Sequence, residues 1–497
     1  MPDLARVAAR GASVTVAAQL TRLGLLLVGL TVLSRLLSPA QVGLVAMATS
    51  VIGVADIVRD FGLSSAALQA TSLTESERAN LWWVNLSIGT ACAAVAACLA
   101  PVIAHAYGDR RVESVVLVLS TQFILSGANT QYRVDLARQM RFTALAATDI
   151  AAQLVSVVVA ITAAVLGAGY WSIVAQQLTF TGVSMVVNVA MCRWLPGRPR
   201  RGVPMRRFFT FGGSVLGTQV MGYAMNNVDN VAIGAVWGAA PLGLYNRAYQ
   251  LLAVPLTQLN APLSRVVLPV LSQVQDDRET LQRYTQRFQL VSCYTLGLGF
   301  GLAAGLASPL VLLLFGRQWT AVAPIFVVLA AGSIFKSFDQ VPYQVYLAKG
   351  LTRQLLKFYL VSRPIMLAMI LAGLPWGPVG VATGHLVAAS VHWAVALLLV
   401  SRLAGIDSRP LFRQSARALL LVITPAALLE QLACRLLVNP WAQVGLGLVL
   451  AATWMALAYL AVRPLRHDIR LLVAQLAKIL SRTPAEPHGP AEPTLTG

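Results

Sequence analysis

The sequence predicts an all-α polytopic membrane protein with two parallel six-helix lobes around a central cavity and two extra C-terminal helices, about 14 transmembrane helices in all. Of its 497 residues, 57% are hydrophobic and only 11% are charged, whereas a soluble domain carries about 25% charged residues. The apolar residues form blocks of 20 to 30, long enough to cross a hydrocarbon core about 30 Å thick as helices. A set of short motifs also recurs after about 200 residues.

The apolar blocks give the number and order of the spans. The first block starts near Gly11, and no cleavage site follows it, so it predicts a spanning helix rather than a signal peptide. The connecting loops are short, and no inserted soluble domain is predicted. The predicted spans are roughly residues 12–34, 40–66, 80–104, 113–132, 144–167, 169–192, 208–234, 240–269, 288–314, 321–346, 355–374, 378–401, 414–437 and 441–462.

The net charge of +19 is distributed as a topology signal. With the N-terminus placed in the cytoplasm, 27 of the 38 Lys and Arg residues fall on the cytoplasmic side and five on the outer side. This asymmetry predicts a multi-pass protein of the bacterial cytoplasmic (inner) membrane with both termini in the cytoplasm. It also argues against a nucleic-acid partner and favours contact with membrane lipids.

An internal repeat predicts the two lobes. Gly43-Leu44 recurs as Gly243-Leu244, and Tyr132–Arg138 recurs in pattern as Tyr343–Lys349, with offsets between 200 and 211. Because each unit holds an even number of spans, both should enter the membrane from the same side, as in transporters built from parallel repeats. The predicted boundaries are an N-terminal lobe at 1–205, a C-terminal lobe at 206–405, two additional helices at 406–463, and a cytoplasmic amphipathic helix with a disordered tail at 464–497.

Several spans carry polar side chains at helical spacing. Such residues either tie helices together by hydrogen bonds or face a hydrated cavity. Arg22 lies deep in the first span without a carboxylate in that span, which predicts contact with an anion in a cavity or, alternatively, a partner such as Asp149 or Asp229. Asp56, Arg59 and Asp60 favour a structural ion-pair cluster. The predicted cavity-lining polar residues are Gln19, Asn129, Asn226, Asn227, Asp229 and Asn230.

Titratable residues in the spans are also candidates for coupling transport to an ion gradient. These are Asp149, Asp339 and His385, although His385 and His392 are more often simply packed. The five cysteines have no spacing typical of a metal site, and no metal or cofactor is expected. No nucleophile–base set and no phosphate-binding Gly-rich loop with a lysine is present, so the sequence predicts a transporter rather than an enzyme.

The segments Ser34–Leu44 and Asp60–Leu68 resemble the opening of the Wzx-like polysaccharide flippases of the multidrug/oligosaccharidyl-lipid/polysaccharide exporter superfamily. Tyr245–Tyr249, Val267–Ser272 and Phe315–Trp319 are similar to the signature of the second half. The resemblance covers roughly residues 11 to 400.

This resemblance implies a flippase that moves a polyprenyl-diphosphate-linked oligosaccharide from the inner to the outer leaflet by alternating access, for cell-surface polysaccharide biosynthesis. It implies a lipid-linked glycan as substrate, other polysaccharide assembly proteins as partners, and a cation gradient or the membrane potential as the drive. The basic residues that match the implied cationic cavity are Arg22, Arg247, Lys336 and Arg363.

Two other functions stay open. A drug or cation antiporter of the same superfamily should have acidic cavity residues, whereas the deep charges here are mainly basic. A membrane glycan polymerase or glycosyltransferase needs catalytic carboxylates and a sizeable outer loop, and neither is visible in the sequence.

Overall fold

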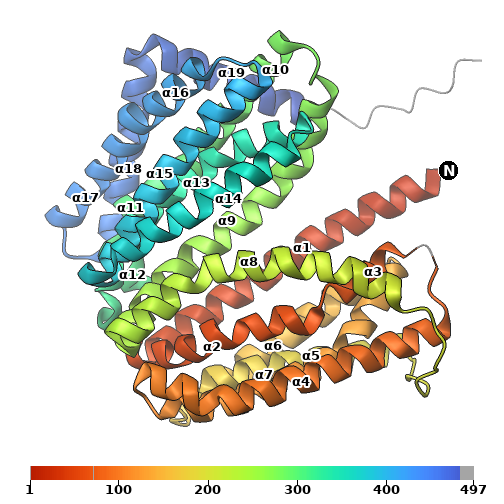
Figure 1. Ribbon diagram of the computed structural model, residues 1–497. Coiled ribbons are helices and arrows are strands. Elements are labelled where there is room, and N and C mark those ends of the chain that lie inside the picture. Colours follow the sequence, from red (N-terminus) through yellow and green to blue (C-terminus); the bar gives the residue numbers. More distant parts are fainter. Residues whose placement is uncertain (1, 71, 482–497) are drawn as a thin grey trace, which may run out of the picture. The chain divides into compact units, whose positions relative to one another are not determined.

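The computed structural model describes residues 2–70 and 72–481, apart from the side chains of residues 2–18, 214, 215, 218, 221, 224, 254–266 and 473–481 (Figure 1). Helices connected by short turns make up this described part, which contains no strand. The predicted polytopic all-α class is therefore confirmed. The tail predicted to be disordered, 482–497, lies outside the described residues.

The helices follow one another with few long connections. In chain order they are α1 (Pro2–Leu36), α2 (Pro39–Asp60), α3 (Leu63–Gln69), α4 (Glu75–Tyr107), α5 (Arg111–Arg138), α6 (Phe142–Val165), α7 (Trp171–Cys192), α8 (Arg206–Trp237), α9 (Ala239–Gln273), α10 (Arg278–Ser292), η1 (Cys293–Gly297), α11 (Leu298–Gly305), α12 (Ala307–Phe315), η2 (Arg317–Trp319), α13 (Val322–Ala348), α14 (Thr352–Ala372), η3 (Leu374–Trp376), α15 (Gly377–Ala404), α16 (Ser408–Arg417), η4 (Ala418–Ile423), α17 (Thr424–Leu436), α18 (Pro440–Ala461) and α19 (Arg463–Ser481).

The predicted spans coincide with these helices. Among the described residues, 11 helical stretches are long and apolar enough to cross a membrane, and the 53-residue stretch Thr352–Ala404 contains both α14 and α15. The predicted spans 208–234 and 240–269 coincide with α8 and α9, whose side chains are described only in part. The predicted amphipathic segment is helix α19.

Three predicted spans are not single α-helices, and one of them is the span at 414–437, which consists of the end of α16, the π-helix η4 and α17. The span predicted at 40–66 breaks where Phe61 and Gly62 adopt positive φ angles of 45° and 64°, which ends α2 and lets α3 start in a new direction. The span predicted at 288–314 consists of the end of α10, the π-helix η1, α11 and α12. Local backbone changes of this kind leave the hydropathy pattern unchanged, so the sequence reading missed them.

The described residues form two compact units. Unit 1 comprises residues 1–257, 307–332 and 359–389, and unit 2 comprises residues 258–306, 333–358 and 390–497. The division runs through α9, α13, α14 and α15 rather than between the predicted six-helix lobes. The lobe boundaries at 205 and 405 therefore stay a prediction.

Small residues bring the helices of unit 1 close together. An added Cβ at Gly43 of α2 would lie 1.7 Å from the Ala239 carbonyl oxygen, and one at Gly243 of α9 would lie 2.0 Å from the Pro39 carbonyl oxygen. Each of the two glycines would also meet the backbone nitrogen of the other. These are the repeat-related glycines of the sequence, and their reciprocal contact is what a local two-fold relation between α2 and α9 produces.

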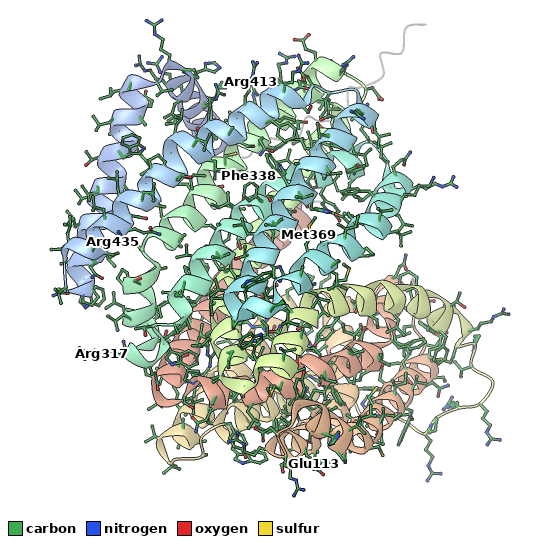
Figure 2. The ribbon with its side chains drawn as sticks, turned by 60° about the vertical axis from the view of Figure 1, so that its left-hand side comes forward. Glu113, Arg317, Phe338, Met369, Arg413 and Arg435 are labelled. Atoms are coloured by element: carbon green, nitrogen blue, oxygen red, sulfur yellow. The ribbon has the colours of Figure 1, made fainter. Side chains whose placement is uncertain are left out.

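In unit 2 the C-terminal helices pack against α11. Gly301 of α11 faces the Ile423 side chain, and Gly305 makes room for Glu430 of α17. Farther along, Val422, Ala458 and Leu465 form an apolar cluster that joins η4, α18 and α19. Figure 2 shows Arg413 of α16 and Arg435 of α17 at opposite ends of the continuous segment formed by α16, η4 and α17.

Candidate substrate cavity

Unit 1 contains a cavity of about 590 Å³ that combines polar and apolar walls. Ligand-binding pockets in proteins have volumes of about 300–1,000 Å³. Its lining residues come from α1, α2, α5, α6, α7 and α9, and are Leu26, Leu30, Leu33, Asp56, Arg59, Gln122, Ser126, Gln153, Ser156, Ile173, Gln176, Gln177, Phe180, Thr181, Arg247 and Gln250. We refer to it as the main cavity.

Arg247 is the cation of the main cavity that has no acidic partner among the described residues. It is only 5% exposed, and its Nη1 donates to Gln250 Oε1 at 2.8 Å. Gln250 in turn donates to Asn246 Oδ1 at 2.8 Å. The guanidinium carbon lies 5.9 Å from the Trp319 ring centroid. Within the described part of the chain, its buried Nε meets no hydrogen-bond acceptor.

Arg59 is the second cation of the main cavity, and a neighbouring carboxylate partly compensates its charge. Its Nε donates to Asp56 Oδ1 at 3.0 Å, and its Nη1 donates to Thr130 Oγ1 at 2.8 Å. The predicted ion pair with Asp56 is thus present, while Asp60 accepts from Ser64 instead. Because one carboxylate stands against two guanidinium groups, the lining of the main cavity carries a net positive charge.

A smaller cavity of about 220 Å³ contains Arg22. It is lined by Gln19, Arg22, Arg133, Phe142, Leu145, Ala146 and Asp149. Asp149 Oδ1 accepts from Arg133 Nη1 at 2.7 Å, whereas its Oδ2 lies 3.7 Å from Arg22 Nη1. Of the two partners considered from the sequence, Arg22 is therefore placed beside Asp149 and not beside Asp229. We refer to this cavity as the small cavity.

The two cavities are neighbours along the same helices. Arg22 of the small cavity lies 5.8 Å from the ring centroid of Phe180, which lines the main cavity. Asp149 and Gln153 lie one turn apart on α6 and line the small and main cavities respectively. The polar stripes that the sequence shows on three separate spans therefore converge on one pair of adjoining spaces.

Four other residues that were predicted to line a cavity lie outside both cavities. Asn129 donates to Ser184 Oγ at 3.2 Å and accepts from Asn188 Nδ2 at 2.9 Å, which ties α5 to α7. Asn227 donates to the Tyr223 carbonyl oxygen of its own helix. Asn226 is exposed, and Asn230 is 6% exposed. None of these four lines the main or the small cavity.

Asp229 and His385 form a buried pair within unit 1. Asp229 Oδ2 accepts from Tyr245 Oη at 2.7 Å and lies 2.9 Å from His385 Nε2. Asp229 is 2% exposed, Tyr245 is fully buried, and His385 is 9% exposed. The group joins α8, α9 and α15, so Asp229, predicted to line a cavity, instead connects three helices.

A second histidine of α15 also lies beside an aspartate. In unit 2, His392 Nε2 is 3.5 Å from Asp339 Oδ2, and the imidazole stacks on Phe358 at 4.9 Å. Arg363 lies over the Tyr359 ring at 4.6 Å. Lys336 and Arg363, both predicted as cavity cations, line neither of the two cavities.

Sequence reasoning missed two features of the structure. The first is the pair of neighbouring glutamines Gln176 and Gln177 of α7 in the main cavity, which belong to none of the predicted polar stripes. The second is Glu430 of α17 in unit 2, which is fully buried and whose carboxylate oxygens meet no hydrogen-bond partner among the described residues. A single carboxylate in an apolar span was the available signal for Glu430.

Comparison with known proteins identifies similar sequences. Residues 32–324 match the family described as polysaccharide biosynthesis protein. Lipopolysaccharide biosynthesis protein WzxC of Escherichia coli (strain K12) is 24% identical over 386 residues, which are 76% of this chain and 77% of that protein. Teichuronic acid biosynthesis protein TuaB of Bacillus subtilis (strain 168) is 29% identical over 322 residues, 63% of this chain and 65% of TuaB.

Solved structures show a similar fold at low sequence identity. The inward closed conformation of the lipid II flippase MurJ has a TM-score of 0.68 and 14% identity, covering 90% of this chain and 98% of that one. An inward-facing multidrug resistance MATE family transporter of the MOP superfamily has a TM-score of 0.57 and 15% identity. This match covers 82% of this chain and 100% of that one. The helices described above therefore have the fold of this transporter superfamily.

Proposed function

Because the chain belongs to the polysaccharide biosynthesis protein family, we propose that it is a flippase for a polyprenyl-diphosphate-linked oligosaccharide in cell-surface polysaccharide biosynthesis. The proposed direction is from the inner to the outer leaflet of the bacterial cytoplasmic membrane, by alternating access. The observation that carries the proposal is the main cavity, in which a buried, unneutralised arginine stands opposite a wall of amides and hydroxyl groups.

Arg247 is the proposed ligand of the diphosphate. Its guanidinium is held in place by Gln250 and Trp319, so little conformational freedom remains to be lost when an anion arrives. A charge-assisted hydrogen bond from guanidinium to phosphate is stronger than one between neutral groups, and it is stronger still away from bulk water. Arg59 adds a second positive charge, weakened by Asp56.

The amides and hydroxyl groups of the main cavity suit a glycan. Gln and Ser side chains both donate and accept hydrogen bonds, as sugar hydroxyl groups require. They come from α5, α6 and α7, while Leu26, Leu30 and Leu33 of α1 provide an apolar strip. In the proposed mode the polyprenyl chain stays in the bilayer and only the polar head group enters the cavity.

We also propose that a cation gradient or the membrane potential drives transport. The supporting observation is that α15 carries two histidines, each beside an aspartate of another helix, at His385–Asp229 and His392–Asp339. Histidine is the side chain whose charge changes most readily near neutral pH. Asp149 lies beside two arginines. This position suits a site where those arginines bind an anion more than a site that couples transport to an ion gradient.

Substitution of Arg247 tests this function. We expect Arg247→Gln to lower the initial rate of flipping about tenfold or more, since a hydrogen bond to a charged group contributes about 1.5–3 kcal/mol. Arg247→Lys should recover part of the rate because it restores the charge but not the planar fork. The measurement is the transfer of a fluorescent polyprenyl-diphosphate-linked disaccharide across proteoliposomes.

The matched control is Arg435→Gln at the end of α17, because Arg435 is not among the residues that line the main cavity. It should flip at the wild-type rate. Wild-type flipping by a correctly folded Arg247→Glu protein would contradict the proposed role of the main cavity, because that variant would repel the diphosphate.

A further inference from the structure

The small cavity has more positive than negative charge. Arg22 and Arg133 both face Asp149, and among the described side chains these three are the charged groups that line it. The side chains of Arg22 and Arg133 are 44% and 40% exposed, and that of Asp149 is 22% exposed. The cavity is therefore reachable rather than sealed, and its arginines are not both neutralised. A cation within a membrane-spanning region needs a partner or a hydrated space.

The geometry around Asp149 resembles the way a phosphate binds two arginines. Arg133 donates to both carboxylate oxygens, from Nη1 to Oδ1 at 2.7 Å and from Nη2 to Oδ2 at 3.5 Å, and Oδ2 also lies 3.7 Å from Arg22 Nη1. The distance to Arg22 is longer than a hydrogen bond, so Arg22 is attracted to Asp149 but not hydrogen-bonded to it. Gln19, one turn before Arg22 on α1, adds an amide to the same wall.

We propose that Arg22 and Arg133 form a second anion subsite for the diphosphate of the lipid-linked substrate, and that Asp149 occupies this subsite as an internal substitute for a phosphate when it is empty. This inference rests on the proposed function and extends it. On binding, the phosphate oxygens displace the Asp149 carboxylate from the two guanidinium groups. On release, the carboxylate takes the place of the phosphate and prevents the site from holding the anion too tightly.

The position of the small cavity makes it an entry site. Along α1, Gln19 and Arg22 of the small cavity precede Leu26, Leu30 and Leu33 of the main cavity. Positive-inside asymmetry predicts that the start of α1 lies at the cytoplasmic side. A substrate from the inner leaflet would thus meet Arg22 before Arg247. Each cavity carries an excess of one arginine over aspartate, which matches a diphosphate diester with a negative charge on each phosphorus.

A purely structural ion pair makes the opposite prediction for Asp149. If Asp149 only ties α1, α5 and α6 together, Asp149→Asn should lower stability and bring no gain in binding. If Asp149 competes with the phosphate, Asp149→Asn should bind a polyprenyl diphosphate about five- to tenfold more tightly, because the two arginines lose their internal competitor. Bound substrate should then leave more slowly, so flipping at saturating substrate should fall.

The experiment uses the full chain in nanodiscs of phosphatidylcholine, with farnesyl diphosphate as the probe and calorimetry as the readout. We expect tighter binding by Asp149→Asn and about tenfold weaker binding by Arg133→Gln. In the double variant Arg22→Gln/Asp149→Asn the excess positive charge of the small cavity is unchanged, and the gain in affinity should be lost. Equal affinity of this double variant and Asp149→Asn would overturn the role of Arg22.

Asp135→Asn is the matched control, because Asp135 forms an ion pair with Arg78 between α4 and α5 outside both cavities. It should not raise the affinity for farnesyl diphosphate. If Asp135→Asn raised the affinity as much as Asp149→Asn does, the gain would come from the overall charge of the protein, and the inference would be overturned. Thermal unfolding of each variant verifies that it is folded, and the double variant supplies the test if Asp149→Asn is not.

Two further arms separate the possible causes of failure. If Arg247→Gln impairs binding and flipping while the Asp149 and Arg133 variants equal wild type, the second subsite is wrong and the proposed function stands. If wild type neither binds farnesyl diphosphate nor flips the disaccharide lipid, the proposed function itself is wrong. If phosphatidylglycerol in the nanodisc abolishes the effect of Asp149→Asn, the subsite binds membrane lipid instead and the inference is overturned.

Discussion

Ionisable side chains in the spanning helices include some that are satisfied by protein partners and others that face a cavity. Asp229 is the best example of the first kind, with Tyr245, His385 and the Asn230 backbone N–H around its carboxylate. Arg247 is the best example of the second kind. The two types lie close along α9, since Tyr245 and Arg247 are two residues apart. Tyr245 thus connects the Asp229 group to α9, the helix that also carries Arg247.

Substitution of His385 tests this residue-level connection. We expect His385→Gln to lower stability by about 1–3 kcal/mol, because the buried Asp229 carboxylate loses or weakens one of its donors. If the pair also takes up a proton during transport, the variant should flip at a rate that no longer responds to an imposed pH gradient. Thermal unfolding and proteoliposome flipping with and without the gradient measure the two effects.

Asn226→Ala provides the matched control on α8, because Asn226 is exposed and lies one turn from Asp229. It should keep both the stability and the gradient response of wild type. A His385→Gln protein with an unchanged gradient response would leave Asp229 and His385 as a purely structural link among α8, α9 and α15.

At the scale of elements, the contact between α2 and α9 depends on two glycines. Gly43 faces the backbone of Ala239 and Gly243, and Gly243 faces the backbone of Pro39 and Gly43. Backbone atoms cannot rotate away as a side chain can. Small residues at such crossings are how membrane helices approach closely without a hydrophobic driving force. The repeat-related positions 43 and 243 are thus required by the packing of unit 1.

Gly43→Ala should therefore destabilise the protein by about 1–3 kcal/mol or more, since the new Cβ would lie 1.7 Å from a carbonyl oxygen and would push α2 and α9 apart. Gly299→Ala in α11 is the control, because nothing lies within 4 Å of its Cβ position, and it should be neutral or slightly stabilising. Thermal unfolding in detergent measures both. Equal unfolding temperatures for the two variants would contradict this close approach of α2 and α9.

The sequence predicts helices and polar stripes well but not the partners of individual side chains. Hydropathy located the spans, and the 3.6-residue spacing placed Arg22, Gln122 and Asp149 on stripes of three helices. Which stripes meet depends on how helices cross, and that is set by contacts between residues far apart in the chain. The sequence therefore left Asp149 and Asp229 equally open as partners of Arg22, and it did not predict that Arg133 shares Asp149.

At the scale of the whole molecule, the direction of transport depends on orientation in the membrane. The charge asymmetry places 27 Lys and Arg residues on the predicted cytoplasmic side and five outside. In the structure, Arg413 of α16 and Arg435 of α17 lie at opposite ends of the α16–α17 segment (Figure 2). An orientation with both termini in the cytoplasm makes the small cavity face the inner leaflet, as an entry site requires.

Cysteine labelling tests this orientation in a variant that lacks the five native cysteines. Single cysteines at Gly197 and Arg413 should be protected in intact cells from a reagent that cannot cross the membrane, while those at Ala168 and Arg317 should react. Arg413 and Arg317 belong to different helical segments, so agreement among all four sites tests the odd number of spans between Arg317 and Arg413 as well as the orientation. Inverted labelling at all four sites would place the Arg22 cavity toward the outer leaflet, and the proposed direction of flipping would then have to be reversed. Inverted labelling at Arg413 alone would instead mean that the number of spans between Arg317 and Arg413 differs by one from the prediction. The two repeats could then not be parallel.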